Sequence, residues 1–151
     1  MNEVSISNVL VKATREMLKE YSTIRFFSSY DNNERRINVN EIISIFEAIL
    51  ERIRNSHPNG DKLYLVLFHS YFHSKRFKRN QLCDNLGAAL INRSITESTL
   101  YRWQQMGIKV FAYALWTNPQ FMDISMNIFT SPYLKRSFSE ICEEHKRLKN
   151  G

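Results

Sequence analysis

Glycine and proline are scarce in this chain, and their scarcity restricts the folds it can adopt. The sequence contains only 4 Gly and 3 Pro among 151 residues. Folds built from many short strands need these two residues in their tight turns. Apolar residues instead recur three and four positions apart along most of the chain, which is the spacing of one helix face. We therefore predict an all-α fold, a helical bundle whose core draws on 43% hydrophobic residues.

Two amphipathic helices are expected in the first part of the chain. Residues 8–30 place apolar side chains on one stripe and charged side chains opposite. After a polar break, Asn38 and Glu41 have the spacing of a capping box for the next helix. Residues 40–54 carry the clearest apolar stripe of the sequence, and a His-Pro-Asn-Gly turn ends it. Residues 1–58 are thus predicted to form an N-terminal helical part.

The next stretch, residues 61–73, is apolar nearly all round and fits either a buried strand or a buried helix. We predict a helix, because the neighbouring segments have helical spacing and no second strand is available for pairing. Beyond it, residues 80–90 and the segment after residue 95 have the pattern of two further helices joined by a short turn. Residues 59–116 would then form one helix-turn-helix part. Residues 117–151 would add a C-terminal helical appendage that packs on the core or forms a dimer surface.

The helix expected from Ile95 to Trp116 is the segment around which the rest is organised. Thr96 is a suitable N-cap, since its hydroxyl can accept a bond from a first-turn N–H. One face of this helix is apolar, whereas the other carries side chains that are short or planar and rich in donors and acceptors. These residues are Glu97, Ser98, Tyr101, Arg102 and Gln105. Such side chains suit the first turns of a DNA recognition helix, where base edges come within reach. An ordinary amphipathic helix with a polar outer face explains the pattern as well.

Positive charge is concentrated in the same part of the chain. Residues 61–116 hold 8 basic and 3 acidic side chains, whereas residues 1–60 hold 8 of each, within a total of +6. The cations Lys75, Arg76, Lys78 and Arg79 follow one another closely, as expected of groups that contact phosphate without reading sequence. This distribution favours a polyanionic partner. A solvated basic loop is the alternative.

Several other classes of function lack support in the sequence. No apolar stretch approaches the ~18 residues of a membrane span, and no signal peptide is expected, so we predict a cytoplasmic protein. Cys83 and Cys142 lie far apart and suit small hydrophobes in a reducing compartment. His69 and His73 share one side of a helix but lack a third metal ligand, so partly buried, hydrogen-bonded histidines are favoured. We expect no metal, no cofactor and no enzyme activity.

The segment Ile95-Thr96-Glu97-Ser98-Thr99-Leu100-Tyr101-Arg102 resembles the helix-turn-helix of sigma factor region 4, and more closely that of the ArpU-like regulators of bacteriophages. Members of this phage family carry a similar LGISESTYYR motif followed by a helix ending in LAxAL, and Phe111 to Leu115 lie at the matching distance here. Residues 13–25 are similar to the opening helix of the family. Two features depart from the pattern: the connection between Gly87 and Ile95 is longer, and residues 117–151 have no counterpart.

The resemblance implies a sequence-specific regulator of phage or prophage transcription, typically of late genes, that binds double-stranded DNA. In this family's arrangement Thr96 caps the recognition helix beside the phosphates, and Glu97, Ser98, Tyr101 and Arg102 face the groove. Arg93, in the longer connection, would reach phosphate. Two alternatives stay open: a DNA-recognition subunit of a phage packaging terminase, and a module that binds bacterial RNA polymerase without reading bases. A homodimer formed through the C-terminal helix is compatible with each.

Overall fold

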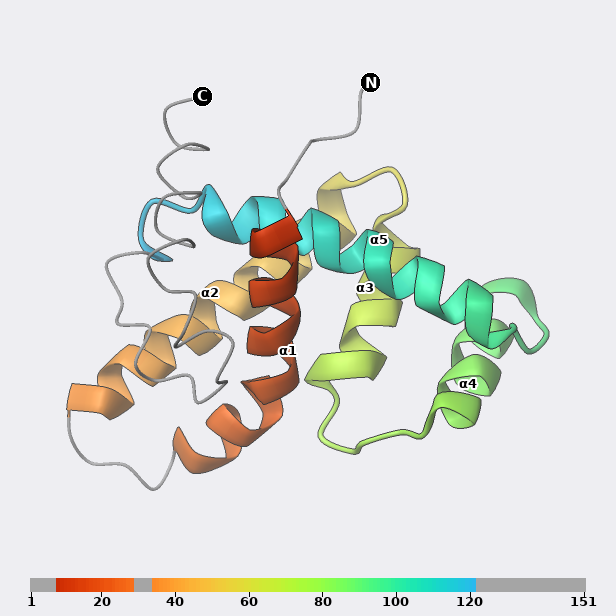
Figure 1. The fold of residues 1–151 in the computed structure, drawn as a ribbon, viewed down its shortest axis with the longest axis horizontal. Helices are drawn as coiled ribbons and strands as arrows, with labels where there is room; N and C mark the ends of the chain where they lie inside the picture. Colours follow the sequence, from red (N-terminus) through yellow and green to blue (C-terminus); the bar gives the residue numbers. More distant parts are fainter. Residues whose placement is uncertain (1–7, 29–33, 122–151) are drawn as a thin grey trace.

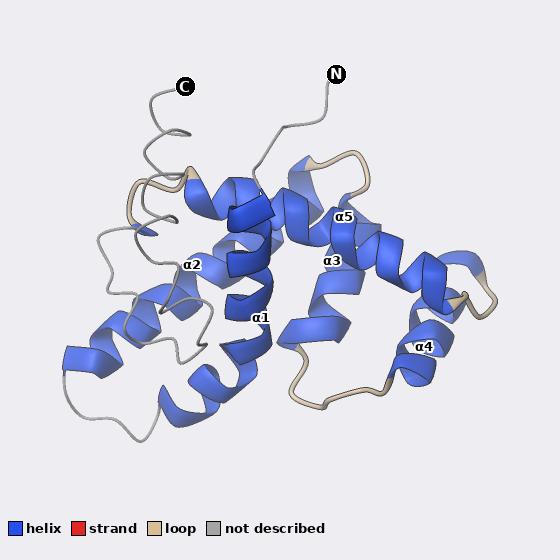
Figure 2. Cartoon of the chain, viewed as in Figure 1, coloured by secondary structure: helices blue, strands red, loops and turns tan. Residues whose placement is uncertain are grey.

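The computed structural model describes residues 8–28 and 34–121, and this part of the chain is helical without strands (Figures 1 and 2). It contains α1 (Asn8–Ser28), α2 (Glu34–Ser56), α3 (Gly60–Leu67), the π-helical turn η1 (Phe68–Phe72), α4 (Arg79–Ile91) and α5 (Glu97–Trp116). The predicted all-α class is therefore confirmed for the described residues. None of the described helices is both long and apolar enough to span a lipid bilayer.

Most element boundaries follow the sequence pattern. The apolar run at 61–73 is helical, as predicted, although its second half adopts the wider π-helical turn. The predicted helix start at Asn38 is wrong, because α2 already begins at Glu34 and Asn38 lies within it. The extra turn has the sequence Glu-Arg-Arg-Ile, and Glu and Arg are good helix formers that need no cap at Asn38 to continue the helix.

The larger of two apolar clusters, here called the large core, joins α1, α2, α3 and the C-terminal half of α5. Phe46 of α2 meets Phe111 of α5 edge to face, with ring centroids 5.1 Å apart. The indole of Trp116 is fully buried and donates to the Thr14 hydroxyl of α1 at 2.9 Å. Burial of so many apolar side chains makes this region the main source of stability.

The second cluster, here called the small core, joins α3, α4, the following turn and the N-terminal half of α5. Its buried members are Val66, Leu82, Cys83, Leu86, Ile95 and Leu100. Figure 1 shows the consequence for α5, which runs from α1 and α2 at one end of the molecule to α4 at the other. The helix is thus held at its C-terminal end by the large core, and its N-terminal turns project beside α4.

The predicted parts of the chain share these cores. The boundary at 58/59 falls in the turn between α2 and α3, but α3 contributes Leu63 and Leu67 to the large core and Val66 to the small core. α5 ends at Trp116, next to the predicted boundary at 116/117, and Phe121 beyond it still packs edge to face on the Trp116 indole. The predicted final helix at 132–149, with its dimer surface, lies outside the described residues.

Candidate nucleic-acid interface

The turn between α4 and α5 folds back over the end of α4. Asn92 ends α4 in the left-handed region, with φ of 62°, and its N–H donates to the Gly87 carbonyl. The N–H of Arg93 donates to the same carbonyl at 3.2 Å, and that of Ile95 donates to the Cys83 carbonyl. A Cβ at Gly87 would lie only 2.0 Å from the carbonyl oxygen of Arg93, so the close return of the chain requires glycine there. The longer connection is therefore a compact turn.

The start of α5 is capped as the sequence predicts. The Thr96 hydroxyl accepts from the backbone N–H of Thr99 at 3.1 Å, and Glu97 adds a negative charge to the first turn. Both features stabilise a helix N-terminus, whose first N–H groups lack partners and whose dipole is positive. The capping role of Thr96 is confirmed, and it fixes where the exposed turns of α5 begin.

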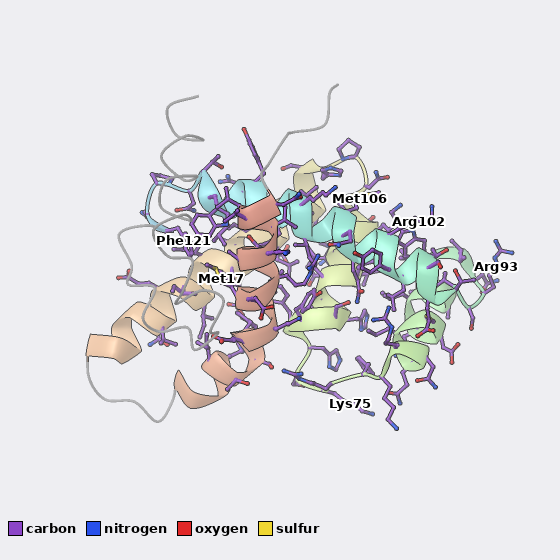
Figure 3. The ribbon with its side chains drawn as sticks, viewed as in Figure 1. Met17, Lys75, Arg93, Arg102, Met106 and Phe121 are labelled. Carbon is purple, nitrogen blue, oxygen red and sulfur yellow. The ribbon has the colours of Figure 1, made fainter. Side chains whose placement is uncertain are left out.

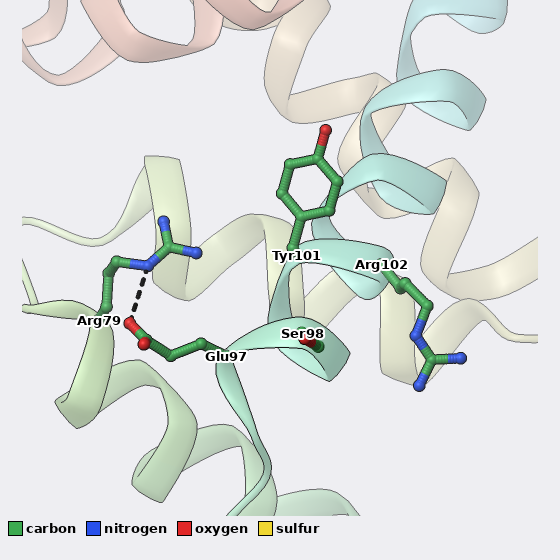
Figure 4. Close-up of a pocket in the computed structure, with 5 residues that line it drawn as sticks. All are labelled: Arg79, Glu97, Ser98, Tyr101 and Arg102. Atoms are coloured by element: carbon green, nitrogen blue, oxygen red, sulfur yellow. Dashed lines mark hydrogen bonds and ion pairs between the residues drawn. The ribbon is translucent and has the colours of Figure 1, made fainter.

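Four of the five predicted base-reading side chains lie together on the surface. Glu97, Ser98, Tyr101 and Arg102 are exposed and, with Arg79 of α4, line one shallow depression (Figure 4). Tyr101 is 54% exposed, more than any other large hydrophobic side chain among the described residues. Figure 4 places Arg79 and Arg102 on opposite sides of Ser98 and Tyr101. The depression thus presents one aromatic ring between two guanidinium groups.

Arg79 and Glu97 form an ion pair across this depression. The Arg79 Nε lies 3.1 Å from a Glu97 carboxylate oxygen, and the two side chains are 57% and 68% exposed. Such an exposed pair contributes little to stability, ~1 kcal/mol or less. The pair connects Arg79, which is predicted to bind phosphate, with Glu97, which is predicted to read bases. In the free protein the Glu97 carboxylate also offsets the charge of Arg79, one of the two arginines at the depression.

The fifth predicted base-reading residue, Gln105, faces α1. Its amide oxygen accepts from the guanidinium of Arg15, and its amide nitrogen donates to the Tyr101 hydroxyl at 2.7 Å. The orientation of the amide follows from chemistry, because a guanidinium has donors only. The Tyr101 oxygen therefore receives a hydrogen bond from Gln105 and keeps its own O–H available to donate outward. Nothing in the sequence pattern indicates Arg15, which lies 90 residues away.

The predicted phosphate-binding cations lie around α4. Lys78 caps α4, its backbone N–H bonded to the Gln81 side chain at 2.8 Å, and Arg79 begins the helix. Arg93 lies in the exposed turn after α4, and Figure 3 shows it and Lys75 on opposite sides of that helix. Arg76 is held differently, since its guanidinium donates to the Lys19 carbonyl of α1 at 3.3 Å. These cations therefore border α4 rather than forming one continuous strip.

Tyr71 of η1 lies within electrostatic reach of cations from two helices, α1 and α4. Burial raises the pKa of Tyr71, while the charges of Arg15 and Arg79 act to lower it. α1 and α4 each contact η1, so charges from both helices act on this one phenol. The arrangement brings Arg15 to the edge of the surface that contains Tyr101.

The other candidate groups do not form a catalytic or metal-binding arrangement within the described residues. No group of three or more His, Cys, Asp or Glu side chains gathers there to hold a metal. The Nδ1 atom of His73 accepts from the Lys75 N–H at 3.0 Å, as expected of a hydrogen-bonded histidine, whereas the buried Nδ1 of His69 has no partner among these residues. Burial and the neighbouring His73 lower the pKa of His69. Burial raises the pKa of Cys83, so its thiol stays protonated in the small core.

Comparisons with protein-family models, curated proteins and solved structures found no match to this chain. The resemblance of residues 95–102 to the ArpU-like regulators therefore stays a prediction from the motif. The roles of the surface residues have to be argued from their own chemistry and positions.

Proposed function

We propose that this protein is a cytoplasmic, sequence-specific DNA-binding regulator in which α4 and α5 act as a helix-turn-helix. The observation that carries the proposal is the position of Glu97, Ser98, Tyr101 and Arg102. All four project from the first turns of α5, in the segment that holds the excess of positive charge. In a helix-turn-helix these turns enter the major groove and contact base edges.

Local structure supports this role for α5. The small core holds α3, α4 and α5 together, and the compact turn closed over Gly87 fixes α4 against the start of α5. A reading surface needs such a rigid scaffold, because base discrimination depends on side-chain placement. The motif resemblance to sigma factor region 4 and the ArpU-like regulators points to transcription as the process, with phage or prophage genes as the targets.

The chemistry of each side chain suggests its contact. Arg102 suits guanine, whose O6 and N7 accept two parallel bonds from a guanidinium, a contact worth ~1–3 kcal/mol of discrimination. The outward O–H of Tyr101 suits an acceptor on a base or phosphate. Lys78 and Arg93 flank α4 and suit backbone phosphates, which position a protein on the duplex without specifying sequence. Glu97 is released from Arg79 if that arginine turns to phosphate.

Selection from random duplex DNA at ~150 mM salt tests the proposal, since non-specific phosphate binding weakens steeply with salt. We expect a discrete site for the wild type and a relaxed preference at one base pair for Arg102→Ala. Lys78→Ala should weaken binding on all sequences and reduce the salt dependence by about one unit. Arg52→Ala, which removes an exposed cation from α2, is the matched control. The absence of any selected site would overturn the proposal.

One observation favours a second candidate, a protein-docking module. Tyr and Arg are the residue types that most often dominate protein interfaces, and the depression presents Tyr101 between Arg79 and Arg102. The exposed carboxylate of Glu97 on this surface also suits a protein partner better than a polyphosphate chain. Co-purification of bacterial RNA polymerase from nuclease-treated lysate, lost in Tyr101→Ala, would favour this candidate over DNA.

A further inference from the structure

A second, more enclosed cavity lies away from the surface of α5. It has a volume of about 130 Å³ and is bounded by α1, η1 and the loop that precedes α4. Since one water molecule occupies ~30 Å³ of liquid, this is room for about four water molecules or one small polyatomic ion. The polar residues that line it are Lys19 and Ser22 of α1, Ser70 and Tyr71 of η1, and His73, Lys75 and Arg76 after it. Lys75, at one edge of this cavity, is well separated from Arg102 in Figure 3.

Two neutral groups of this cavity, His73 and Ser70, are arranged as hydrogen-bond donors. The Nδ1 of His73 accepts from the Lys75 N–H at 3.0 Å, so in the neutral ring the proton resides on Nε2, which can only donate. The Ser70 hydroxyl accepts from the side-chain amide of Gln104 at 3.1 Å, which leaves its own hydrogen to donate. In both cases a neighbour fixes the polarity of a group that could otherwise accept.

The charged groups of the cavity are all cations. Lys19, Lys75 and Arg76 line it, and no carboxylate is among the described residues that do so. The bond from Arg76 to the Lys19 carbonyl uses one of the five N–H donors of the guanidinium and holds it against α1. Lys19 has a loose contact with Glu16 at 3.7 Å, and its side chain is 56% exposed. Three positive charges and several donors around a small volume match the needs of a tetrahedral oxyanion.

We propose that this cavity binds a phosphate group. The inference rests partly on the proposed function, because the sequence pattern predicts that Lys75 and Arg76 contact DNA phosphates, but the chemistry of the cavity does not require DNA. The phosphate is either part of a DNA backbone or a free phosphate ion or monoester. Binding joins α1, η1 and the loop before α4, adding to the bond between Arg76 and the Lys19 carbonyl.

Titration of inorganic phosphate into the full chain at constant ionic strength tests the proposal. We expect saturable shifts of the His73 ring signals in NMR spectra, and affinity at least about tenfold weaker for Arg76→Gln, since a bond to a charged group is lost. Lys19→Gln should also weaken binding, whereas Lys12→Gln removes the same charge from an exposed position on α1 and should leave it unchanged. Shifts that never saturate, or equal losses for Lys19→Gln and Lys12→Gln, would show general charge attraction and overturn the proposal.

A second titration distinguishes the two sources of phosphate. If the cavity takes a backbone phosphate, saturating phosphate at constant ionic strength will lower the affinity for duplex DNA in the wild type and not in Arg76→Gln. If it takes a free phosphate, the ion and the duplex will bind together. A protein that binds phosphate with the expected variant pattern and selects no duplex would retain this site while refuting the proposed function.

Discussion

The large core and the small core differ in what they bury, although α5 runs through both. In the large core the Thr14 hydroxyl donates to the Leu10 carbonyl at 2.7 Å and accepts from the Trp116 indole, so its buried polar groups are paired internally. The small core buries apolar side chains and the protonated thiol of Cys83. The polar groups near the small core lie on the protein surface, around the exposed turns of α5. One helix therefore carries the stabilising contacts at one end and the surface chemistry at the other.

This division predicts that changes in the two cores have different consequences. Damage to the large core should lower global stability without altering the shape of the surface in the molecules that remain folded. Damage to the small core should misplace the surface at a smaller cost in global stability.

The largest effect is expected for Trp116→Ala in the large core. The variant loses a fully buried ring and its bond to Thr14, and such truncations cost ~3–5 kcal/mol. Equilibrium unfolding in urea measures the loss. Tyr113→Ala is the matched control on the same helix, because its side chain is 39% exposed and should cost far less. Equal losses for the two variants would contradict the assignment of stability to the large core.

Compared with Trp116→Ala, Gly87→Ala is expected to lose less stability but more affinity for duplex DNA. The new Cβ would lie 2.0 Å from the Arg93 carbonyl oxygen and 2.8 Å from the Ser94 Cα, so the turn has to move. Overpacking of this kind costs ~1–3 kcal/mol, and it displaces α5 from α4. Thermal unfolding and affinity for the selected duplex report the two effects.

The control for this variant is Ala88→Gly, at the adjacent exposed position of α4. A glycine in a helix interior costs ~1 kcal/mol relative to alanine but leaves the turn in place. Duplex affinity measured well below the unfolding temperature should then fall for Gly87→Ala and not for Ala88→Gly. Equal reductions would mean that the return of the chain over Gly87 does not position α5.

The sequence predicted the helices well because their amphipathic spacing is a local property. The cap at Thr96 could be predicted for the same reason, and so could the exposed face that carries Glu97, Ser98, Tyr101 and Arg102. The start of α2 was misplaced because a favourable cap sequence also occurs inside helices. The role of Gly87 as the position over which the chain returns could not be read from spacing, since it depends on how the turn folds in three dimensions.

The contacts that orient the surface could not be predicted for a related reason. The partners in the Arg15–Gln105 bond are 90 residues apart, and those in the Ser70–Gln104 bond are 34 apart. Each depends on how α1 or η1 packs on α5, and no periodicity encodes that packing. The proposed phosphate-binding cavity could not be predicted for the same reason. Lys19 and Ser22 of α1 line it together with residues of a loop that is distant in the sequence.

The smallest effect on stability, and the sharpest test of the surface, is expected for Gln105→Glu. The new carboxylate can still accept from Arg15, but it must also accept from the Tyr101 O–H, because it has no donor of its own. The Tyr101 O–H then donates to residue 105 and can no longer donate to the duplex. We expect duplex affinity to fall by ~1 kcal/mol, the net value of one hydrogen bond, together with a charge effect that salt weakens.

A double-mutant cycle with Tyr101→Phe separates these two contributions. In the phenylalanine background the hydroxyl is already absent, so Gln105→Glu should retain only its charge effect. The 13Cζ signal of Tyr101 should also shift in Gln105→Glu without DNA, since the phenol changes from acceptor to donor towards residue 105. Additive losses in the cycle would mean that Gln105 does not set the polarity of Tyr101. The large core would then support the exposed surface of α5 through packing only. Arg15 of α1 would have no part in what Tyr101 recognises.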